Sequence, residues 1–249
     1  MDLGIEGRVA LVLGASKGIG RAVATELAGE GARVAVASRS RDALDQLAAQ
    51  IGAGAFEHDN ADLDGVPALI DAVTQALGPV EILVTNTGGP PPSPDPLAQP
   101  LEDWEAAYRT LVLAPLALIR AVLPGMRERG FGRIVNIGSW TVREPLANLM
   151  LSNSHRSATF AAFKTIARDV AADGVTLNTV LPGRIGTDRL YTLSGGREQA
   201  EALGRTDVPA ARLGTPREMA AAVAFLCSER ASYITGVGLL VDGGLSRLS

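Results

Sequence analysis

The sequence predicts an α/β fold in which a doubly wound, parallel sheet of seven strands lies between two layers of helices. Short apolar runs alternate with longer amphipathic stretches along most of the 249 residues, which is the rhythm of βαβ units. The short runs are rich in Val, Ile and Leu and lack polar alternation, as in strands that helices cover on both faces. Right-handed crossovers between consecutive strands then give a three-layer α/β/α arrangement.

The predicted elements follow one another in order along the chain. The strands are residues 8–13, 33–37, 55–58, 82–85, 133–137, 176–181 and 238–241. The helices are residues 18–30, 41–51, 62–77, 101–129, 149–172 and 216–227. The last helix has a clear start, because Thr215 can cap it, Pro216 suits its first position and Glu218 completes a capping box. A chain of this length with 47% apolar residues can bury one large core, so we expect a single domain over residues 1–249.

The composition of the chain argues against several classes of binding partner. A net charge of −4 does not suit a nucleic acid or an anionic membrane, since both call for clustered positive charge. No apolar run reaches the roughly 18 residues of a membrane span and no signal peptide precedes the first strand, so we expect a cytoplasmic protein with a small-molecule or protein partner. His58, His155 and the single cysteine, Cys227, are scattered, so we expect neither an internal disulfide nor a metal site.

Two irregular segments interrupt the alternation. Residues 88–100 hold six prolines and leave the carboxyl end of a strand, where open α/β sheets bind ligands. We interpret them as a stiff wall beside a pocket, with a solvated linker as the alternative. Residues 183–213 lack an early helical period, and we interpret them as a mobile lid over the substrate, with a solvated insertion as the alternative. Arginines in this second segment hint at an anionic substrate; they are Arg184, Arg189, Arg197 and Arg205.

A glycine-rich turn joins the first strand to the first helix. Its sequence is Gly14-Ala15-Ser16-Lys17-Gly18-Ile19-Gly20. Glycines at this place allow backbone N–H groups to approach a pyrophosphate at the N-terminus of a helix. A glycine-rich turn can also be a tight connection and nothing more, but its position between a strand and a helix favours a dinucleotide site.

The end of the second strand indicates which dinucleotide binds. The sequence there is Ser38-Arg39-Ser40-Arg41, and it lacks the acidic residue that would bind the ribose diol of NAD. Arg39, helped by Lys17, could instead pair with a ribose 2′-phosphate. NADP is therefore favoured over NAD. The alternative is that Arg39 and Arg41 form an ordinary solvated start of a helix.

With these features, the chain resembles the short-chain dehydrogenase/reductase family nearly end to end, and within it the 3-oxoacyl-acyl-carrier-protein reductases. The resemblance implies a Rossmann-type sheet and an NADP site. Further matches are His58-Asp59, Asn86-Thr87-Gly88, the strand Gly132 to Ser139, the run Pro182-Gly183-Arg184-Ile185-Gly186-Thr187, and residues 234–236 and 241–244. By family likeness, Asp59 would contact adenine, and the loop with Pro182, Gly183, Ile185 and Thr187 would hold the nicotinamide carboxamide. The other cofactor residues that it implies are Gly14, Ser16, Lys17, Gly18, Ile19, Gly20, Arg39, Asn86 and Gly88.

The family implies hydride transfer between a nicotinamide and a carbonyl or alcohol carbon, with a catalytic Ser, Tyr, Lys and Asn. Ser139 matches the family's Ser, but by the family's spacing the Tyr position falls on Ser152, the Lys position on Arg156 and the Asn position on Leu111. A serine hydroxyl is a much weaker acid than a phenol, and a guanidinium cannot pass protons along a relay. Ser139, Ser152 and Arg156 are thus the candidate catalytic residues, and the proton donor must be non-standard.

Other groups could supply the proton. His155 lies three residues after Ser152, on roughly the same helix face, although a lone helical histidine is more often a packing residue. Tyr191 could swing in from the lid, and a lid or interface role is its stronger alternative. Tyr108, one turn before Leu111, is most simply a helix-packing residue.

Three functions remain open at this stage. The first and favoured one is an NADP-dependent oxidoreductase of a small carbonyl or alcohol. The second is a catalytically silent NADP-binding protein that serves as a sensor or as a partner subunit. The third is a cofactor-independent lyase similar to the halohydrin dehalogenases; it fares worst, because those enzymes keep the Tyr and give up the cofactor turn. Resemblance also implies a homotetramer that pairs through the helices predicted at residues 101–129 and 149–172.

Overall fold

A computed structural model describes residues 2–248 and contains the parallel seven-stranded sheet that the sequence predicts. The strands lie in the order β3-β2-β1-β4-β5-β6-β7, and every neighbouring pair is parallel. The direction of strand order therefore reverses between β1 and β4, which is the place where open α/β sheets bind ligands. The strands are β1 (Val9–Leu13), β2 (Arg33–Ser38), β3 (Gly54–Glu57), β4 (Ile82–Thr85), β5 (Gly132–Ile137), β6 (Val175–Pro182) and β7 (Gly238–Val241).

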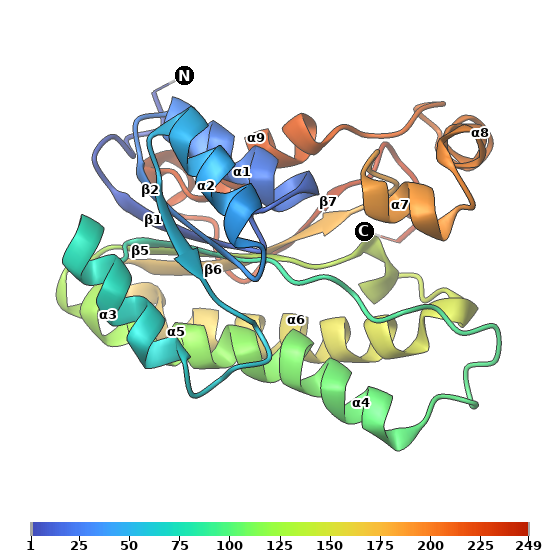
Figure 1. Ribbon diagram of the computed structural model, residues 1–249, viewed down its shortest axis with the longest axis horizontal. Coiled ribbons are helices and arrows are strands. Elements are labelled where there is room, and N and C mark those ends of the chain that lie inside the picture. Colours follow the sequence, from blue (N-terminus) through green and yellow to red (C-terminus); the bar gives the residue numbers. More distant parts are fainter. Residues whose placement is uncertain (1, 249) are drawn as a thin grey trace.

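Helices cover both faces of the sheet, and this confirms the three-layer prediction (Figure 1). On one face lie α1 (Gly18–Gly29), α2 (Arg41–Ile51) and α9 (Pro216–Leu226). On the other face lie α3 (Val66–Leu77), α4 (Leu101–Tyr108), α5 (Ala114–Glu128) and α6 (Met150–Val170). Two further helices, α7 (Asp188–Leu193) and α8 (Arg197–Asp207), lie at one end of the sheet, together with the chain between β4 and α4.

Each inner strand contributes to two apolar cores, one on either face of the sheet. In β1, for example, Ala10 and Val12 belong to the core beneath α1, α2 and α9, whereas Leu11 and Leu13 belong to the core beneath α3, α5 and α6. Successive side chains of a strand point to opposite faces, so a strand that is buried on both sides must be apolar throughout. This explains why most strands of the sheet are apolar throughout; β6 is an exception, with buried Thr176, Asn178 and Thr179.

The helix predicted at residues 101–129 is not uniform. It consists of α4, a π-helical turn over Arg109–Leu113, and α5. By length and composition, Leu101–Glu128 is apolar enough to cross a membrane, so the expectation that no segment reaches that length is wrong. Core helices of globular proteins meet the same criterion, and here the inner face of α5 packs against the sheet through Leu118, Ile119, Val122 and Met126.

The segment 183–213 is more helical than its sequence suggests. It forms α7 and α8, separated by Gly195 and Gly196, which both have positive φ. The Oγ1 atom of Thr187 accepts a hydrogen bond from the N–H of Leu190 and so caps α7. Helix α7, with six residues, is too short to leave a periodic pattern, and its cap and tertiary contacts stabilise it rather than an amphipathic face. The expectation that the first part of this segment is not helical is therefore wrong.

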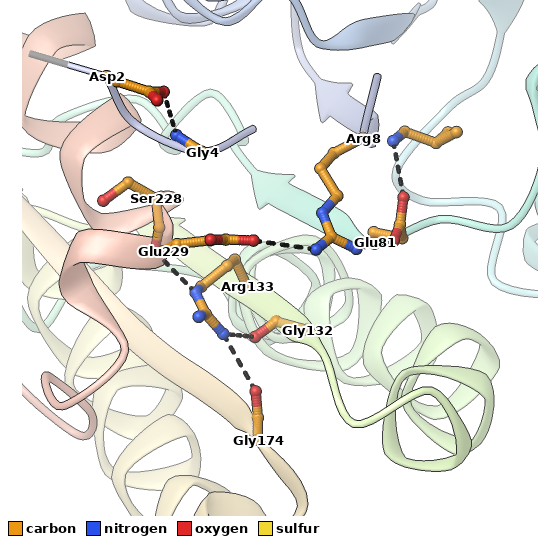
Figure 2. A network of polar contacts seen from close by, with 10 residues as sticks. Asp2, Gly4, Arg8, Glu81, Gly132, Arg133, Gly174, Ser228 and Glu229 are labelled. Carbon is orange, nitrogen blue, oxygen red and sulfur yellow. Dashed lines mark hydrogen bonds and ion pairs between the residues drawn. The ribbon is translucent and has the colours of Figure 1, made fainter. Parts of the chain in front are cut away.

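A polar network lies at the amino ends of the strands, at the end of the sheet opposite to the glycine-rich turn. Arg8 forms ion pairs with Glu81 at 2.6 Å and with Glu229 at 3.1 Å (Figure 2). Arg133 is only 3% exposed, and both guanidinium groups lie over the ring of Phe131, at 3.9 Å for Arg8 and 4.4 Å for Arg133. Arg133 donates hydrogen bonds of 2.9–3.0 Å to the carbonyl oxygens of Gly132, Gly174 and Ser228. The hydrogen-bond partners of Arg133 are main-chain carbonyl oxygens, so we assign this network a role in stabilising the fold.

Candidate active site

Within residues 2–248, the first N–H groups of α1, which follow the glycine-rich turn, have no side-chain partner. Gly14 and Gly18 adopt left-handed backbone conformations, with φ of +61° and +58°. Lys17 precedes α1 without capping it through its side chain, and no acidic residue lies in the first turn. The N-terminus of a helix attracts anions through these N–H groups and the helix dipole. The turn is therefore built to receive an anionic group.

The same turn brings three segments into contact that only glycine permits. A Cβ atom on Gly20 would lie 2.3 Å from the carbonyl oxygen of Gly14, and a Cβ atom on Gly14 would lie 2.6 Å from that of Asn86. Asn86 also donates a hydrogen bond of 3.2 Å from Nδ2 to the oxygen of Gly14. A Cβ atom on Gly88, by contrast, would meet nothing within 4 Å. The turn is thus closely packed around Gly14 and Gly20, whereas the space beside Gly88 is open.

The end of β2 presents an exposed cationic group beside the turn. The side chain of Arg39 is 79% exposed, and its Nη1 lies 3.9 Å from Oδ2 of Asp59, which is a long and solvated ion pair. Lys17 is exposed as well. The neighbouring Asn60, which our sequence reading missed, donates from Nδ2 to Oγ1 of Thr87 at 2.6 Å. It therefore ties the loop after β3 to the loop after β4.

Ser139 follows β5 and begins a 3₁₀ turn over Trp140–Val142. Its Oγ accepts hydrogen bonds from the N–H of Thr141 at 3.2 Å and from the hydroxyl of Thr141 at 2.9 Å. Because both contacts use the lone pairs of Ser139, its own O–H remains free to donate. Thr141 was not among the residues that we predicted from the sequence.

Arg156 connects α6 to the carboxyl ends of two strands. Its Nε donates to Oγ of Ser152 at 3.2 Å, its Nη1 to the carbonyl oxygen of Ile137 at 2.9 Å, and its Nη2 to that of Thr87 at 3.0 Å. These bonds leave two of the five guanidinium N–H groups without a protein partner. Burial, and then the charge of nearby Arg189, lower the pKa of Arg156 to about 10, so it stays cationic at neutral pH. Ser152 is 6% exposed and keeps a free O–H.

The π-helical turn brings Leu111 next to α6. Leu111 is 4% exposed, and its carbonyl oxygen accepts a hydrogen bond of 2.6 Å from Oγ1 of Thr159. A π-turn inside an α-helix often marks a functional site, because it changes the hydrogen bonding of one carbonyl group. Here that carbonyl group has a buried threonine hydroxyl as its partner, and the side chain at position 111 offers no polar atom.

The other proton-donor candidates have different partners. The ring of His155 lies 5.3 Å from that of Trp104 and 6.1 Å from that of Tyr108, and its Nδ1 is 2.7 Å from the carbonyl oxygen of Leu151. The ring of Tyr191 lies beneath the guanidinium of Arg197 at 4.5 Å. Within residues 2–248, none of the three candidates, His155, Tyr191 and Tyr108, forms a hydrogen bond with Ser139 or Ser152.

The loop after β6 faces the glycine-rich turn. Gly183 approaches the backbone of Asp242, where a Cβ atom would lie 2.6 Å from Cα. Ile185 pairs with Gly214 in a parallel bridge, so the two ends of segment 183–213 are held together. A Cβ atom on Gly18 would lie 3.5 Å from Cγ2 of Thr187, which places the start of α7 opposite the start of α1. Among the described residues, no group of three or more His, Cys, Asp or Glu side chains could hold a metal ion.

Comparisons with known proteins agree with this geometry. Residues 14–246 match the family model described as enoyl-(acyl carrier protein) reductase. The chain belongs to the short-chain dehydrogenase/reductase family. It is 38% identical over 249 residues to 3-oxoacyl-[acyl-carrier-protein] reductase FabG of Vibrio cholerae, covering 98% of this chain and 99% of that one. It is 37% identical over 246 residues to (2S)-[(R)-hydroxy(phenyl)methyl]succinyl-CoA dehydrogenase subunit BbsC of Thauera aromatica, covering 96% and 95%.

Solved structures of family members are also close. L-sorbose reductase from Gluconobacter frateurii, complexed with NADPH and L-sorbose, has a TM-score of 0.92 and 32% identity over 100% of both chains. YwfH, an NADPH-dependent reductase involved in bacilysin biosynthesis, has a TM-score of 0.91 and 30% identity, covering 97% of this chain and 99% of that one. These proteins share a fold and differ in substrate. Membership of this family therefore identifies the chain as a member of an oxidoreductase family, but it does not identify the substrate.

Proposed function

We propose that this protein is an NADP-dependent oxidoreductase that transfers a hydride between the nicotinamide and a small carbonyl or alcohol substrate, with a non-standard proton donor. The observation that carries the proposal is the turn around Gly14 and Gly20, whose close contacts and free helical N–H groups fit a pyrophosphate. Solved neighbours in the family were crystallised with NADP or NADPH. Bound NADP supplies the hydride donor or acceptor; the protein supplies position and charge.

Distinct groups of the chain fit the parts of this cofactor. The turn with the α1 N-terminus would take the pyrophosphate, and Arg39 with Lys17 would take the ribose 2′-phosphate. The loop after β6 would hold the nicotinamide. The residues that we assign to NADP are Gly14, Ser16, Lys17, Gly18, Ile19, Gly20, Arg39, Asp59, Asn86, Gly88, Pro182, Gly183, Ile185 and Thr187.

In the proposed mechanism, Ser139 and Ser152 orient the substrate oxygen. Each hydroxyl accepts hydrogen bonds from the protein and keeps its own O–H to donate. As the carbonyl carbon gains a hydride, negative charge grows on the oxygen, and the cationic Arg156 beside Ser152 favours that charge. No acidic side chain in the described residues hydrogen-bonds to either serine to replace a lost proton, so water protonates the oxygen, and the hydroxide that remains exchanges with solvent.

An equilibrium titration with NADPH and, in parallel, NADH tests the cofactor assignment. We expect NADPH to bind at least about tenfold more tightly than NADH, since Arg39 gains a charge-assisted pair only with the 2′-phosphate. Arg39→Leu should remove most of this preference, with Lys17 retaining the rest, and leave NADH affinity unchanged. Arg41→Leu is the matched control, because Arg41 already pairs with Asp45 at 2.8 Å. If neither nucleotide binds, the oxidoreductase proposal is wrong.

A second candidate function is a catalytically silent NADP-binding protein, a sensor or a partner subunit. What favours it is that His155 and Tyr191 pack against other groups and leave Ser152 with no neighbouring acid. On this hypothesis, Ser152→Tyr combined with Arg156→Lys creates NADPH-dependent carbonyl reduction that the parent lacks, because a phenol beside an ammonium exchanges protons readily. Steady-state assays of both proteins measure this. Reduction of any carbonyl compound by the parent excludes the silent protein.

The cofactor-independent lyase is not proposed, because the dinucleotide turn retains its close contacts at Gly14 and Gly20. The homotetramer, the cytoplasmic location and the absence of nucleic-acid, membrane and metal partners stay predictions.

A further inference from the structure

Two arginines from different helices meet beside the proposed substrate site. Arg189 lies on α7 and Arg156 on α6. A Cβ atom on Gly89 would lie 2.7 Å from Nη2 of Arg189 and 3.6 Å from Nη2 of Arg156, so both guanidinium groups approach one point. They also bind the same stretch of chain, since Arg156 donates to the carbonyl oxygen of Thr87 and Arg189 to that of Pro90 at 3.1 Å. Helices α6 and α7 thus bring two cations together.

These two cations lack a counter-charge in the described chain. Six other arginines form ion pairs with carboxylates, namely Arg8, Arg39, Arg41, Arg127, Arg184 and Arg212. Within residues 2–248, neither Arg156 nor Arg189 forms one. Burial lowers the pKa of both groups, and the charge of Arg189 lowers that of Arg156 further. Like charges that are partly desolvated and close together raise the energy of the free protein, and a bound anion would offset that cost.

The unused donors have the chemistry of a carboxylate site. Arg189 uses only one guanidinium nitrogen, Nη2, within the described chain, and Arg156 retains two free N–H groups. A guanidinium matches the two oxygens of a carboxylate with parallel hydrogen bonds. Main-chain carbonyl oxygens hold each guanidinium group in place, and because these oxygens are uncharged, they do not neutralise the two positive charges.

We propose that Arg189 and Arg156 bind a carboxylate group of the substrate, which is a short 2-oxo or 3-oxo acid or the corresponding hydroxy acid. The inference rests on the proposed function, because it concerns the same site. Arg156 contacts Ser152 at 3.2 Å, so a carboxylate held by Arg156 lies next to the place where Ser152 meets the carbonyl oxygen. A substrate whose carboxylate is one or two carbons away from the carbonyl carbon could therefore contact Arg156 and Ser152 at the same time, whereas a substrate with a more distant anionic group could not.

Calorimetric titration of the NADP⁺-saturated protein tests this with matched pairs. The probes are 2-oxobutanoate against methyl 2-oxobutanoate, and acetoacetate against methyl acetoacetate; no turnover occurs, because cofactor and probe are both oxidised. We expect at least one acid to bind about tenfold or more tightly than its ester. Arg189→Leu should remove that preference and leave the affinities for the ester and for NADPH unchanged. Arg197→Leu, also in the lid segment but stacked on Tyr191, should retain it.

Other outcomes overturn the inference and can be told apart from failure of the proposed function. Equal affinity of acid and ester, or no binding of either acid at about 10 mM, excludes a carboxylate site. If Arg189→Leu weakens NADPH binding and spares the acid, the arginine serves the cofactor's diphosphate and the inference is wrong. A protein that binds NADPH but no acid keeps the oxidoreductase function. A protein that binds the acids without binding NADPH keeps the carboxylate site and loses that function.

Discussion

Ser139→Ala should lower kcat/KM for NADPH-dependent reduction of a carbonyl substrate by about 100-fold, or ~2.7 kcal/mol of transition-state stabilisation. Two hydrogen bonds from Thr141 hold the oxygen of Ser139, so its O–H is directed away from Thr141 and has no protein acceptor in residues 2–248. A donor fixed before the reaction begins stabilises the charge that develops on the substrate oxygen and needs no reorganisation. Removing it affects the transition state more than the bound substrate, so kcat should fall while KM changes little.

The measurement is a steady-state assay that follows nicotinamide absorbance with a substrate that the parent turns over. Ser154→Ala is the matched control, because Ser154 lies on α6 two residues beyond Ser152 and its hydroxyl contacts only the sulfur of Met150, at 3.7 Å. That variant should turn over at the rate of the parent, and both variants should bind NADPH as the parent does. Unchanged turnover of Ser139→Ala would remove this residue from the mechanism.

Strands and long helices could be predicted because they obey strong local rules. The bounds of β4, β7 and α2 agree with the sequence prediction, and the other strands differ by one or two residues. The capping box before α9 forms as predicted, with the N–H of Glu218 donating to Oγ1 of Thr215 at 3.2 Å and the N–H of Thr215 donating to Oε2 of Glu218 at 2.8 Å. Apolar runs and caps are decided by neighbours in sequence, so a single chain is enough to read them.

Elements that depend on tertiary contacts were missed. The π-helical turn Arg109–Leu113 lies inside a continuous apolar helix and changes no residue pattern, so periodicity cannot reveal it. Helix α3 begins at Val66 rather than at residue 62, because a carboxylate oxygen of Asp62 accepts a hydrogen bond from the N–H of Gly65 and forms a turn there. In each case an interaction specific to this fold decides the outcome.

The candidate site shows the same division. Glycines that must lie in close contact could be found from their position after a strand, as at Gly14 and Gly20. The contacts of Arg156 could not, because they join it to a carbonyl oxygen 69 residues away, that of Thr87. Its proximity to Arg189 depends likewise on how two loops meet at the carboxyl edge of the sheet. A polar residue three positions beyond the end of a strand was the signal available for Asn60, since loops at the carboxyl ends of strands carry the site in such folds.

Gly20→Ala should weaken NADPH binding by more than about 100-fold and lower the melting temperature by several degrees. The added methyl would lie 2.3 Å from the carbonyl oxygen of Gly14 and 2.7 Å from Nδ2 of Asn86. The nearest of these atoms is backbone, so the clash cannot be relieved by a side-chain rotation. Helix α1 must move away from β1, and its N-terminal N–H groups then leave the place that a pyrophosphate would occupy. Fluorescence titration and thermal unfolding measure both effects.

Gly29→Ala separates this effect from that of an alanine in the same helix. Gly29 is the last residue of α1, and a Cβ atom there would meet nothing within 4 Å. Alanine stabilises a helix by up to about 1 kcal/mol over glycine, so this variant should melt at the parental temperature or slightly above and bind NADPH equally well. If Gly20→Ala behaves like Gly29→Ala, then the close contact between α1 and β1 is not what positions the cofactor. The pyrophosphate would have to be held elsewhere, and the geometric basis for the NADP site would be lost.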